Sequence, residues 1–139
     1  MRIALDSSVL VAAHISRAGV CAELLEELLL HHELVTSDFI IEEVARKLFE
    51  KFDFLNRDCA AVAEFLRRAS TVVTPTQLPA DVCRDADDIA VLGTAKAGEC
   101  RLLISVDRDL LDRQQFEGTA IVRPGEFWRR TAEPTSGAS

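Results

Sequence analysis

Short apolar runs alternate along this chain with longer segments in which apolar residues recur at helical spacing. Five of these runs have the length and composition of buried strands, at 2–5, 34–36, 71–73, 101–105 and 120–122. Helices are predicted over 20–32, around 40–48, after Asp58, over 85–97, at 110–111 and from Pro124 onward. Strands that alternate with helices are joined by crossovers, which favour a parallel sheet covered on both faces. The pattern therefore predicts an α/β fold with three layers, α/β/α, around a central parallel sheet of about five strands.

The size and composition of the chain fit one ordinary domain. Of its 139 residues, 48% are hydrophobic and 28% are charged, which is enough apolar material for a core and excludes wholesale disorder. We expect one domain over 1–131. A flexible tail is expected over 132–139, where Pro, Ser, Gly and Ala predominate.

The sequence also bears on the compartment. No apolar run reaches the length of a membrane span, and Asp6 interrupts the apolar start of the chain, so neither a span nor a signal peptide is expected. The four cysteines, at positions 21, 59, 83 and 100, form no C-x-x-C pair. This spacing favours free thiols in a reducing environment. We therefore expect a cytoplasmic protein that makes no membrane contact.

The net charge of −7 argues against a protein that coats nucleic acid electrostatically. It is compatible with an enzyme that holds metal ions with carboxylates and contacts a polyanion through a few local arginines. Two of the predicted strands, 2–5 and 101–105, run into Asp6 and Asp107. Because α/β folds place their sites at the carboxyl ends of parallel strands, these two aspartates are candidates for one site.

Four acidic segments together resemble a known family. They are L-D-S-S-V-L-V-A-A at 5–13, S-D-F-I-I-E-E-V at 37–44, D-A-D-D-I-A-V-L-G-T-A at 85–95 and L-L-I-S-V-D-R-D-L-L at 102–111. In order and spacing they resemble the PIN-domain nucleases, in particular the short prokaryotic branch of toxin components of toxin–antitoxin pairs, with VapC-type toxins as relatives. The resemblance extends from Arg2 to about Arg130 and implies a PIN-like form of the predicted fold.

The resemblance implies four catalytic acids. In the family an aspartate closes the first strand and a glutamate lies in the helix after the second, and the matching residues are Asp6 and Glu43. A third acid, seven residues before a helix alanine, matches Asp88, and a fourth, before D-L-L, matches Asp107. Asp109, two residues further on, is expected to be an accessory acid.

Two further residues near these acids are expected to contribute. The family commonly has D-T-N at the first acid, whereas this chain has Asp6-Ser7-Ser8. Ser8 still offers a hydroxyl to a metal-bound water or to Asp107, and we interpret it as an accessory residue. Arg108 follows Asp107 directly and is the candidate for binding a substrate phosphate.

The implied cofactor is Mg²⁺ or Mn²⁺. In the family's sheet the first and fourth strands are neighbours, which would place Asp6 and Asp107 roughly 5 Å apart, the spacing between strands. Carboxylates at that distance repel each other, and a hard divalent cation relieves the repulsion. We therefore expect Asp6 and Asp107 to be the main ligands and Asp88 to bind the metal directly or through water. Glu43 would be an outer ligand or a base that orients the attacking water.

The resemblance implies a Mg²⁺- or Mn²⁺-dependent endoribonuclease, which hydrolyses phosphodiester bonds in RNA and acts as the toxin of a toxin–antitoxin pair. Its partners would be an RNA substrate, a cognate antitoxin protein and a second copy of the chain in a homodimer. The leucine-rich helix over 20–32 is interpreted as core, with part of it available for an interface.

Each acid also has an ordinary structural interpretation. Asp85, Asp87 and Asp88 stand where the start of a helix favours negative charge. Asp107 or Asp109 could likewise cap the helix at 110–111. The aspartates therefore point to a site only when the four segments are taken together.

Two other classes of function are open to such a chain: a PIN module without effective catalysis, and a different kind of Mg²⁺ site at the edge of a parallel sheet. A PIN fold without effective catalysis could serve as an RNA-binding or protein-binding module, although the presence of all four acids argues against it. One of these four acids, Glu43, is selected only by the family motif, because a helical wheel does not separate it from Glu42. A phosphotransfer receiver would need an aspartate after a middle strand, and an aspartate phosphatase would need D-x-D where this chain has Asp6-Ser7-Ser8. Both of these fit poorly.

Overall fold

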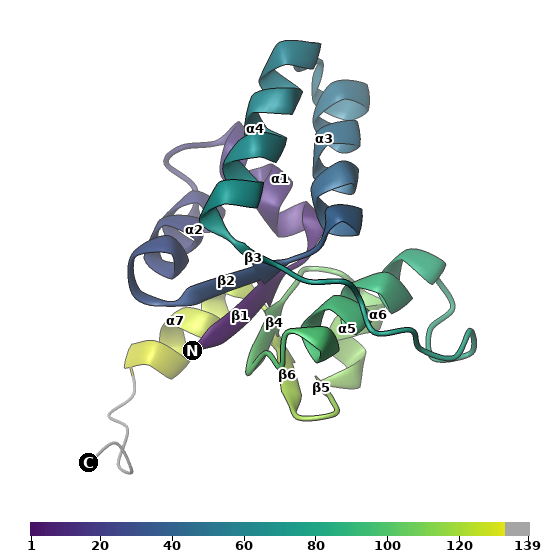
Figure 1. The fold of residues 1–139 in the computed structure, drawn as a ribbon. Coiled ribbons are helices and arrows are strands. Elements are labelled where there is room, and N and C mark those ends of the chain that lie inside the picture. Colours follow the sequence, from purple (N-terminus) through teal and green to yellow (C-terminus); the bar gives the residue numbers. More distant parts are fainter. Residues whose placement is uncertain (133–139) are drawn as a thin grey trace.

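The computed structural model describes residues 1–132 and shows a six-stranded sheet with helices on both faces (Figure 1). The elements are β1 (Arg2–Leu5), α1 (Ser7–Ile15), α2 (Val20–His31), β2 (Glu33–Thr36), α3 (Asp38–Phe52), α4 (Asn56–Ala69), β3 (Thr71–Val72), α5 (Ala86–Ala97), β4 (Leu102–Ile104), α6 (Arg108–Arg113), β5 (Gln115–Phe116), β6 (Thr119–Val122) and α7 (Pro124–Ala132). The predicted α/β class with three layers is confirmed. Apart from residue 132, which ends α7, the predicted flexible tail lies outside the described residues.

The strands lie in the order β3-β2-β1-β4-β6-β5. The first five of these are parallel, and β5 pairs with β6 in the antiparallel direction. Leu5 at the end of β1 lies opposite Ile104 at the end of β4, so both strands finish at the same edge of the sheet. The expected neighbouring position of the first and fourth predicted strands is confirmed.

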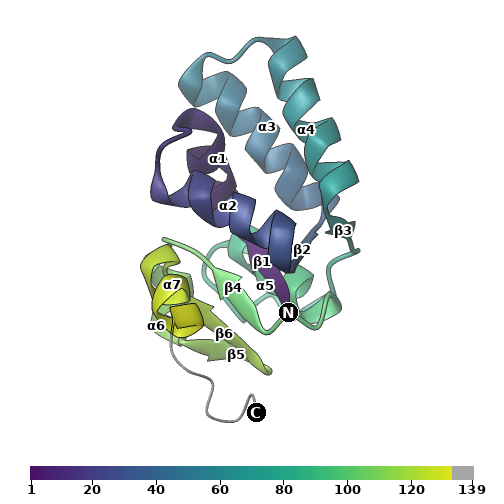
Figure 2. The same ribbon diagram turned by 90° about the vertical axis from the view of Figure 1, so that its left-hand side faces the viewer.

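The connections on the two sides of β1 and β4 run in opposite directions along the sheet. The chain passes from β1 to β2 and β3 through α1–α4, which form one group on one side of the strands (Figure 1, Figure 2). It then returns to β4 through α5, which contacts β1 and β2 from the other face. Strand order therefore reverses between β1 and β4, and a crevice at the carboxyl ends of such strands is where α/β sheets bind ligands.

Two elements differ from the sequence expectation. No helix was expected over residues 7–15, where α1 forms, because its run V-L-V-A-A is apolar on every side and shows no helical period. The sheet has six strands rather than about five, because a hairpin adds β5 at the edge. The hairpin turn consists of Glu117 and Gly118, whose φ values of 44° and 89° are both positive, as a two-residue hairpin turn of type I′ requires.

The core lies on both faces of β1 and β4. Helix α5 packs close to the segment that follows β3. Strand residues Ile3, Leu5 and Leu103 are fully buried. Gly93 of α5 accepts a hydrogen bond from the Thr76 backbone N–H at 2.9 Å. A Cβ at position 93 would lie 2.4 Å from the Thr76 carbonyl oxygen, so only glycine allows this approach.

Within residues 1–132, no single helix is long and apolar enough to cross a membrane; α1 and α2 together meet that measure of length and composition, but a bend of 106° separates them. All four cysteines are free thiols, and Cys59 and Cys100 are buried.

Candidate functional site

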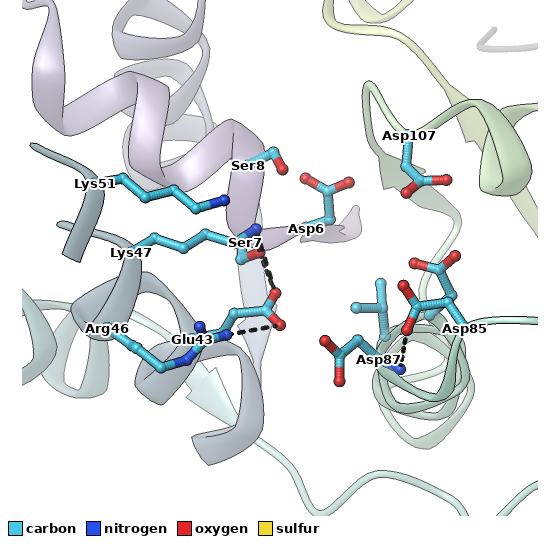
Figure 3. A pocket seen from close by; sticks show the side chains of 12 residues that line it. Asp6, Ser7, Ser8, Glu43, Arg46, Lys47, Lys51, Asp85, Asp87 and Asp107 are labelled. Atoms are coloured by element: carbon cyan, nitrogen blue, oxygen red, sulfur yellow. Dashed lines mark hydrogen bonds and ion pairs between the residues drawn. The ribbon is translucent and has the colours of Figure 1, made fainter. Parts of the chain in front are cut away.

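A cavity of about 230 Å³ opens at the carboxyl ends of β1 and β4 (Figure 3). Six carboxylates line it, from Asp6, Glu43, Asp85, Asp87, Asp88 and Asp107. The other polar lining residues are Ser7, Ser8, Arg46, Lys47 and Lys51. The four acids expected from four separate segments of the sequence thus converge on one cavity.

Asp6 is held rigidly where β1 passes into α1. It is the N-cap of α1, and its Oδ1 accepts a hydrogen bond from the Val9 backbone N–H at 3.1 Å. Its Oδ2 accepts from the Ser105 hydroxyl. Only 5% of the residue is exposed. Burial raises the pKa of Asp6, although these two hydrogen bonds and the charge of Lys47 oppose the rise.

Asp107 stands opposite Asp6, at the start of α6. Its Oδ1 caps that helix by accepting from the Leu110 backbone N–H at 3.2 Å, as the capping interpretation had it. Its own backbone N–H donates to the Ser105 hydroxyl oxygen at 2.9 Å. Capping occupies only one of the two carboxylate oxygens, so it is compatible with a second use of the side chain.

Asp88 reaches the cavity from the first turn of α5 and is only 7% exposed. Burial, followed by the charges of Asp107 and Asp85, raises the pKa of Asp88 to about 6. The cap of α5 is Asp85, whose side chain accepts from the Asp87 backbone N–H at 2.8 Å. Asp88 therefore lies inside the cavity as a buried carboxyl that repels its neighbours.

Three aspartates come close enough to share an ion. One side-chain oxygen each from Asp88, Asp107 and Asp109 lies within 4.8 Å of the other two. Asp109 is exposed and pairs with Arg84 at 2.8 Å. In the part of the chain that the structure describes, Asp6 is not a member of this group, although it lines the same cavity.

Glu43 lies across the cavity from Asp107 (Figure 3). It projects from α3, is 9% exposed, and its Oε1 accepts from the Ser7 hydroxyl. Glu42 on the same helix is exposed. The structure thus separates the two glutamates, which the helical period alone did not, and brings Glu43 to the cavity.

Basic side chains of α3 border Glu43. The Lys47 ammonium nitrogen lies 2.9 Å from the Ser7 hydroxyl oxygen and 3.6 Å from Oε1 of Glu43, and Arg46 lies 3.7 Å from Oε2. Lys51 lines the cavity one turn beyond Lys47. Arg108, expected as the phosphate ligand, is exposed on α6 and does not line the cavity. Among the described residues, the basic side chains that line the cavity therefore come from α3.

Sequence reasoning missed two serines that organise the site. Ser7 bridges α1 and α3 through Glu43 and Lys47, and Ser105 bridges the ends of β1 and β4. Ser8, expected as an accessory residue, lines the cavity, but the hydroxyl next to the Asp107 backbone is that of Ser105. Both missed serines stand inside the motif segments, at 5–13 and 102–111, and only their position beside the acids could have marked them.

The PIN domain family model matches residues 2–109, and the chain belongs to the PIN domain family. Two solved structures share its fold. One is VapBC2 from Rickettsia felis bound to a DNA fragment from their promoter, with 11% identity and a TM-score of 0.62 over 87% of this chain and 97% of that chain. The other is VapBC-1 from nontypeable Haemophilus influenzae, with 16% identity and a TM-score of 0.61 over 90% of this chain and 99% of that chain. No curated protein matches the sequence.

Proposed function

We propose that this PIN-domain protein is a metal-dependent endoribonuclease of the VapC type, which hydrolyses phosphodiester bonds in RNA. The observation that carries the proposal is the convergence of Asp6, Glu43, Asp88 and Asp107 on one cavity at the switch point of the sheet. These acids come from four distant segments of the chain, so ordinary helix capping does not account for their meeting.

The residues fit a divalent cation. Carboxylate oxygens are the ligands that Mg²⁺ and Mn²⁺ prefer, and those of Asp88, Asp107 and Asp109 lie within 4.8 Å of one another. The raised pKa of Asp88, to about 6, reflects in part a repulsion among acids that a cation would relieve. Asp6, Asp88 and Asp107 would hold the ion, with Asp109 as an accessory acid. A bound ion of this kind supplies Lewis-acid activation of the phosphate and of water.

The chain's own side chains supply the remaining roles. Ser105 and the Val9 N–H hold Asp6 in one orientation, which fixes the geometry of its carboxylate before substrate arrives. Glu43, on the opposite wall, would orient the attacking water and accept its proton. Ser8 would offer its hydroxyl to water or substrate at the cavity. Because the chain carries a net charge of −7, local cations are needed at the phosphates of RNA.

Arg108 and the α3 cations are proposed to meet those phosphates. Arg46, Lys47 and Lys51 line the cavity itself. Arg108 is exposed next to Asp107 and would contact a phosphate further along the strand.

As partners we propose a cognate antitoxin and a second copy of the chain. The antitoxin is suggested by the likeness to the VapBC structures from Rickettsia felis and Haemophilus influenzae. On α2, Leu24, Leu25 and Leu28 are buried, as expected of a core helix, whereas Val20 and Leu30 are 53% and 66% exposed. Exposed apolar side chains of this kind are available for an interface. The cytoplasm is the compartment we propose for the pair.

The test is cleavage of a labelled pool of RNA of randomised sequence in the presence of Mn²⁺. Wild type should cut the pool, EDTA should stop cleavage, and Asp107→Asn should slow it at least about 100-fold. Asp112→Asn is the matched control, since Asp112 is exposed on the same helix and lies outside the cavity. Saturable Mn²⁺ binding without cleavage of any RNA would contradict the nuclease and favour the alternative of an RNA-binding or protein-binding module.

A further inference from the structure

We propose that the ammonium group of Lys47 takes the place of a second metal ion beside Glu43, so that the cavity binds a single divalent cation on its aspartate side. The inference rests on the proposed metal-dependent function and specifies it, because two-metal and one-metal phosphodiester hydrolysis stabilise the charge on the phosphate oxygens with different groups. It follows from an uneven distribution of charge in the cavity (Figure 3).

Glu43 and its neighbour Asp87, whose pKa is raised by burial and then by the charge of Glu43, are matched by two internal cations. Lys47 lies 3.6 Å from Oε1 and Arg46 lies 3.7 Å from Oε2, so each carboxylate oxygen faces a positive charge. Oε1 also accepts from the Ser7 hydroxyl. With only 9% of the residue exposed, little of this carboxylate remains open to a metal ion.

Lys47 is more enclosed than an ordinary surface lysine. Its ammonium nitrogen lies 2.9 Å from the Ser7 hydroxyl oxygen, and Ser7 is only 3% exposed. The Lys47 side chain is itself 21% exposed, against 52% for Arg46. A lysine ammonium carries three donors. One N–H donates to the Ser7 hydroxyl, and Glu43 lies at ion-pair distance, so the ammonium keeps donors that can meet a phosphate oxygen in the cavity.

Around Asp88, Asp107 and Asp109 the negative charge is less fully matched by cations. The oxygens of Asp88, Asp107 and Asp109 lie within 4.8 Å of one another, and within residues 1–132 the cation paired with this group is Arg84, which contacts the exposed Asp109. Asp88 and Asp107 therefore keep their charge available for an ion. A dication placed beside Glu43 would meet the Lys47 ammonium at close range, and like charges repel strongly in a partly buried site.

These observations assign the two positive charges of the site to different groups, a metal ion and the ammonium of Lys47. The metal ion would serve the aspartates, and Lys47 would stabilise negative charge on a phosphate oxygen, the role that a second ion has in two-metal enzymes. Lysine suits this role because its ammonium is a compact point charge.

The stoichiometry of Mn²⁺ binding tests the proposal. Wild type and variants are titrated with MnCl₂ by calorimetry, and bound ions are counted independently from the loss of the free Mn²⁺ signal in electron paramagnetic resonance. Lys47→Met removes the charge, and Lys47→Gln removes it but keeps an N–H donor, so a folding defect in one variant does not hide the result. Lys47→Arg restores the charge. Arg46→Met is the matched control, because Arg46 also pairs with Glu43 from the neighbouring position.

We expect one bound ion in wild type, Lys47→Arg and Arg46→Met, and two in Lys47→Met and Lys47→Gln. Adding Glu43→Gln to Lys47→Gln should return the count to one, since the second ion would need the Glu43 carboxylate. Two ions in wild type, or one ion in both charge-removing variants, would overturn the role of Lys47 and leave the metal-dependent nuclease standing. No bound ion in wild type would overturn the proposed function and the role of Lys47 together.

Discussion

The hydroxyl of Ser105 donates a hydrogen bond to the carboxylate of Asp6, across the boundary between β4 and β1. The same hydroxyl oxygen accepts from the backbone N–H of Asp107 at 2.9 Å. One fully buried side chain therefore fixes two of the six acids that line the cavity. Hydrogen bonds within the protein therefore hold Asp6 and Asp107 in position relative to each other.

Replacing Ser105 by alanine should destabilise the fold. The variant leaves the buried Asp6 oxygen and the Asp107 N–H without their partner, and a buried polar group that loses its partner costs about 1–3 kcal/mol. Urea denaturation in EDTA measures the loss. Ser105→Thr keeps the hydroxyl and is the control. Equal denaturation midpoints for Ser105→Ala and wild type would show that the shared hydroxyl does not hold the two acids.

Glu43→Gln should reduce RNA cleavage by about 100-fold, because the amide cannot accept a proton from the attacking water. Glu42→Gln, one residue earlier on α3, should stay within about twofold of wild type, since Glu42 is exposed and does not line the cavity. Single-turnover cleavage of the same RNA compares the two variants. A larger loss for Glu42→Gln than for Glu43→Gln would contradict the assignment.

Much of the fold was predictable from the sequence, because its strands are short apolar runs and most of its helices have one apolar face. Helix α3 illustrates this: Ile40, Val44 and Leu48 recur at helical spacing and are all fully buried, and Ser37 caps the helix. The exception is α1, which is buried on several sides, so that its sequence carries no period. Strand β5 consists of Gln115 and Phe116, of which only the second is apolar, so it forms no apolar run.

The site was predictable in its acids and not in its hydrogen-bonded supports. The acids Asp6 and Asp107 follow strands, and the topology of a parallel sheet brings such positions together. Ser7, Ser105 and Lys47 act through tertiary contacts between residues 36, 99 and 40 positions apart, which no local pattern encodes. Arg108 adjoins Asp107 in sequence and stays a prediction, whereas the cations that line the cavity come from α3.

The metal-free protein should lose stability as the pH rises from about 4 to about 6. Burial, followed by the charges of Asp107 and Asp85, raises the pKa of Asp88 to about 6 from its ordinary value of 3.8. Between these values the folded chain keeps a proton that the unfolded chain has released, so the free energy of unfolding falls with rising pH. We expect a fall of about 1–2 kcal/mol after solvent screening.

The measurement is a series of urea titrations in EDTA, for wild type beside Asp88→Asn. The variant carries no charge at position 88 and should show a shallower decline, with greater stability than wild type above pH 6. Identical pH profiles for the two proteins would mean that Asp88 is not the group that titrates.

Gly93→Ala should destabilise the protein by about 2 kcal/mol or more. Its Cβ would lie 2.4 Å from the carbonyl oxygen of Thr76, a backbone atom that cannot move aside without shifting the chain after β3. Gly125→Ala is the matched control, since a Cβ there meets nothing within 4 Å and α7 gains up to about 1 kcal/mol of helix propensity. Thermal denaturation ranks the two. A Gly93→Ala variant as stable as Gly125→Ala would contradict the close approach of α5.

The most direct test of the carboxylate–metal nuclease is calorimetric titration of wild type and Asp6→Asn with Mn²⁺, with RNA cleavage measured on the same preparations. Asp6→Asn keeps the shape of the side chain and should remain folded, which circular dichroism verifies. Saturable binding accompanied by cleavage is expected in wild type, and the variant should bind at least about tenfold more weakly and cut no RNA. An Asp6→Asn variant that binds Mn²⁺ and cleaves RNA as wild type does, or a wild type that binds no Mn²⁺ at millimolar concentration, would contradict the proposed function.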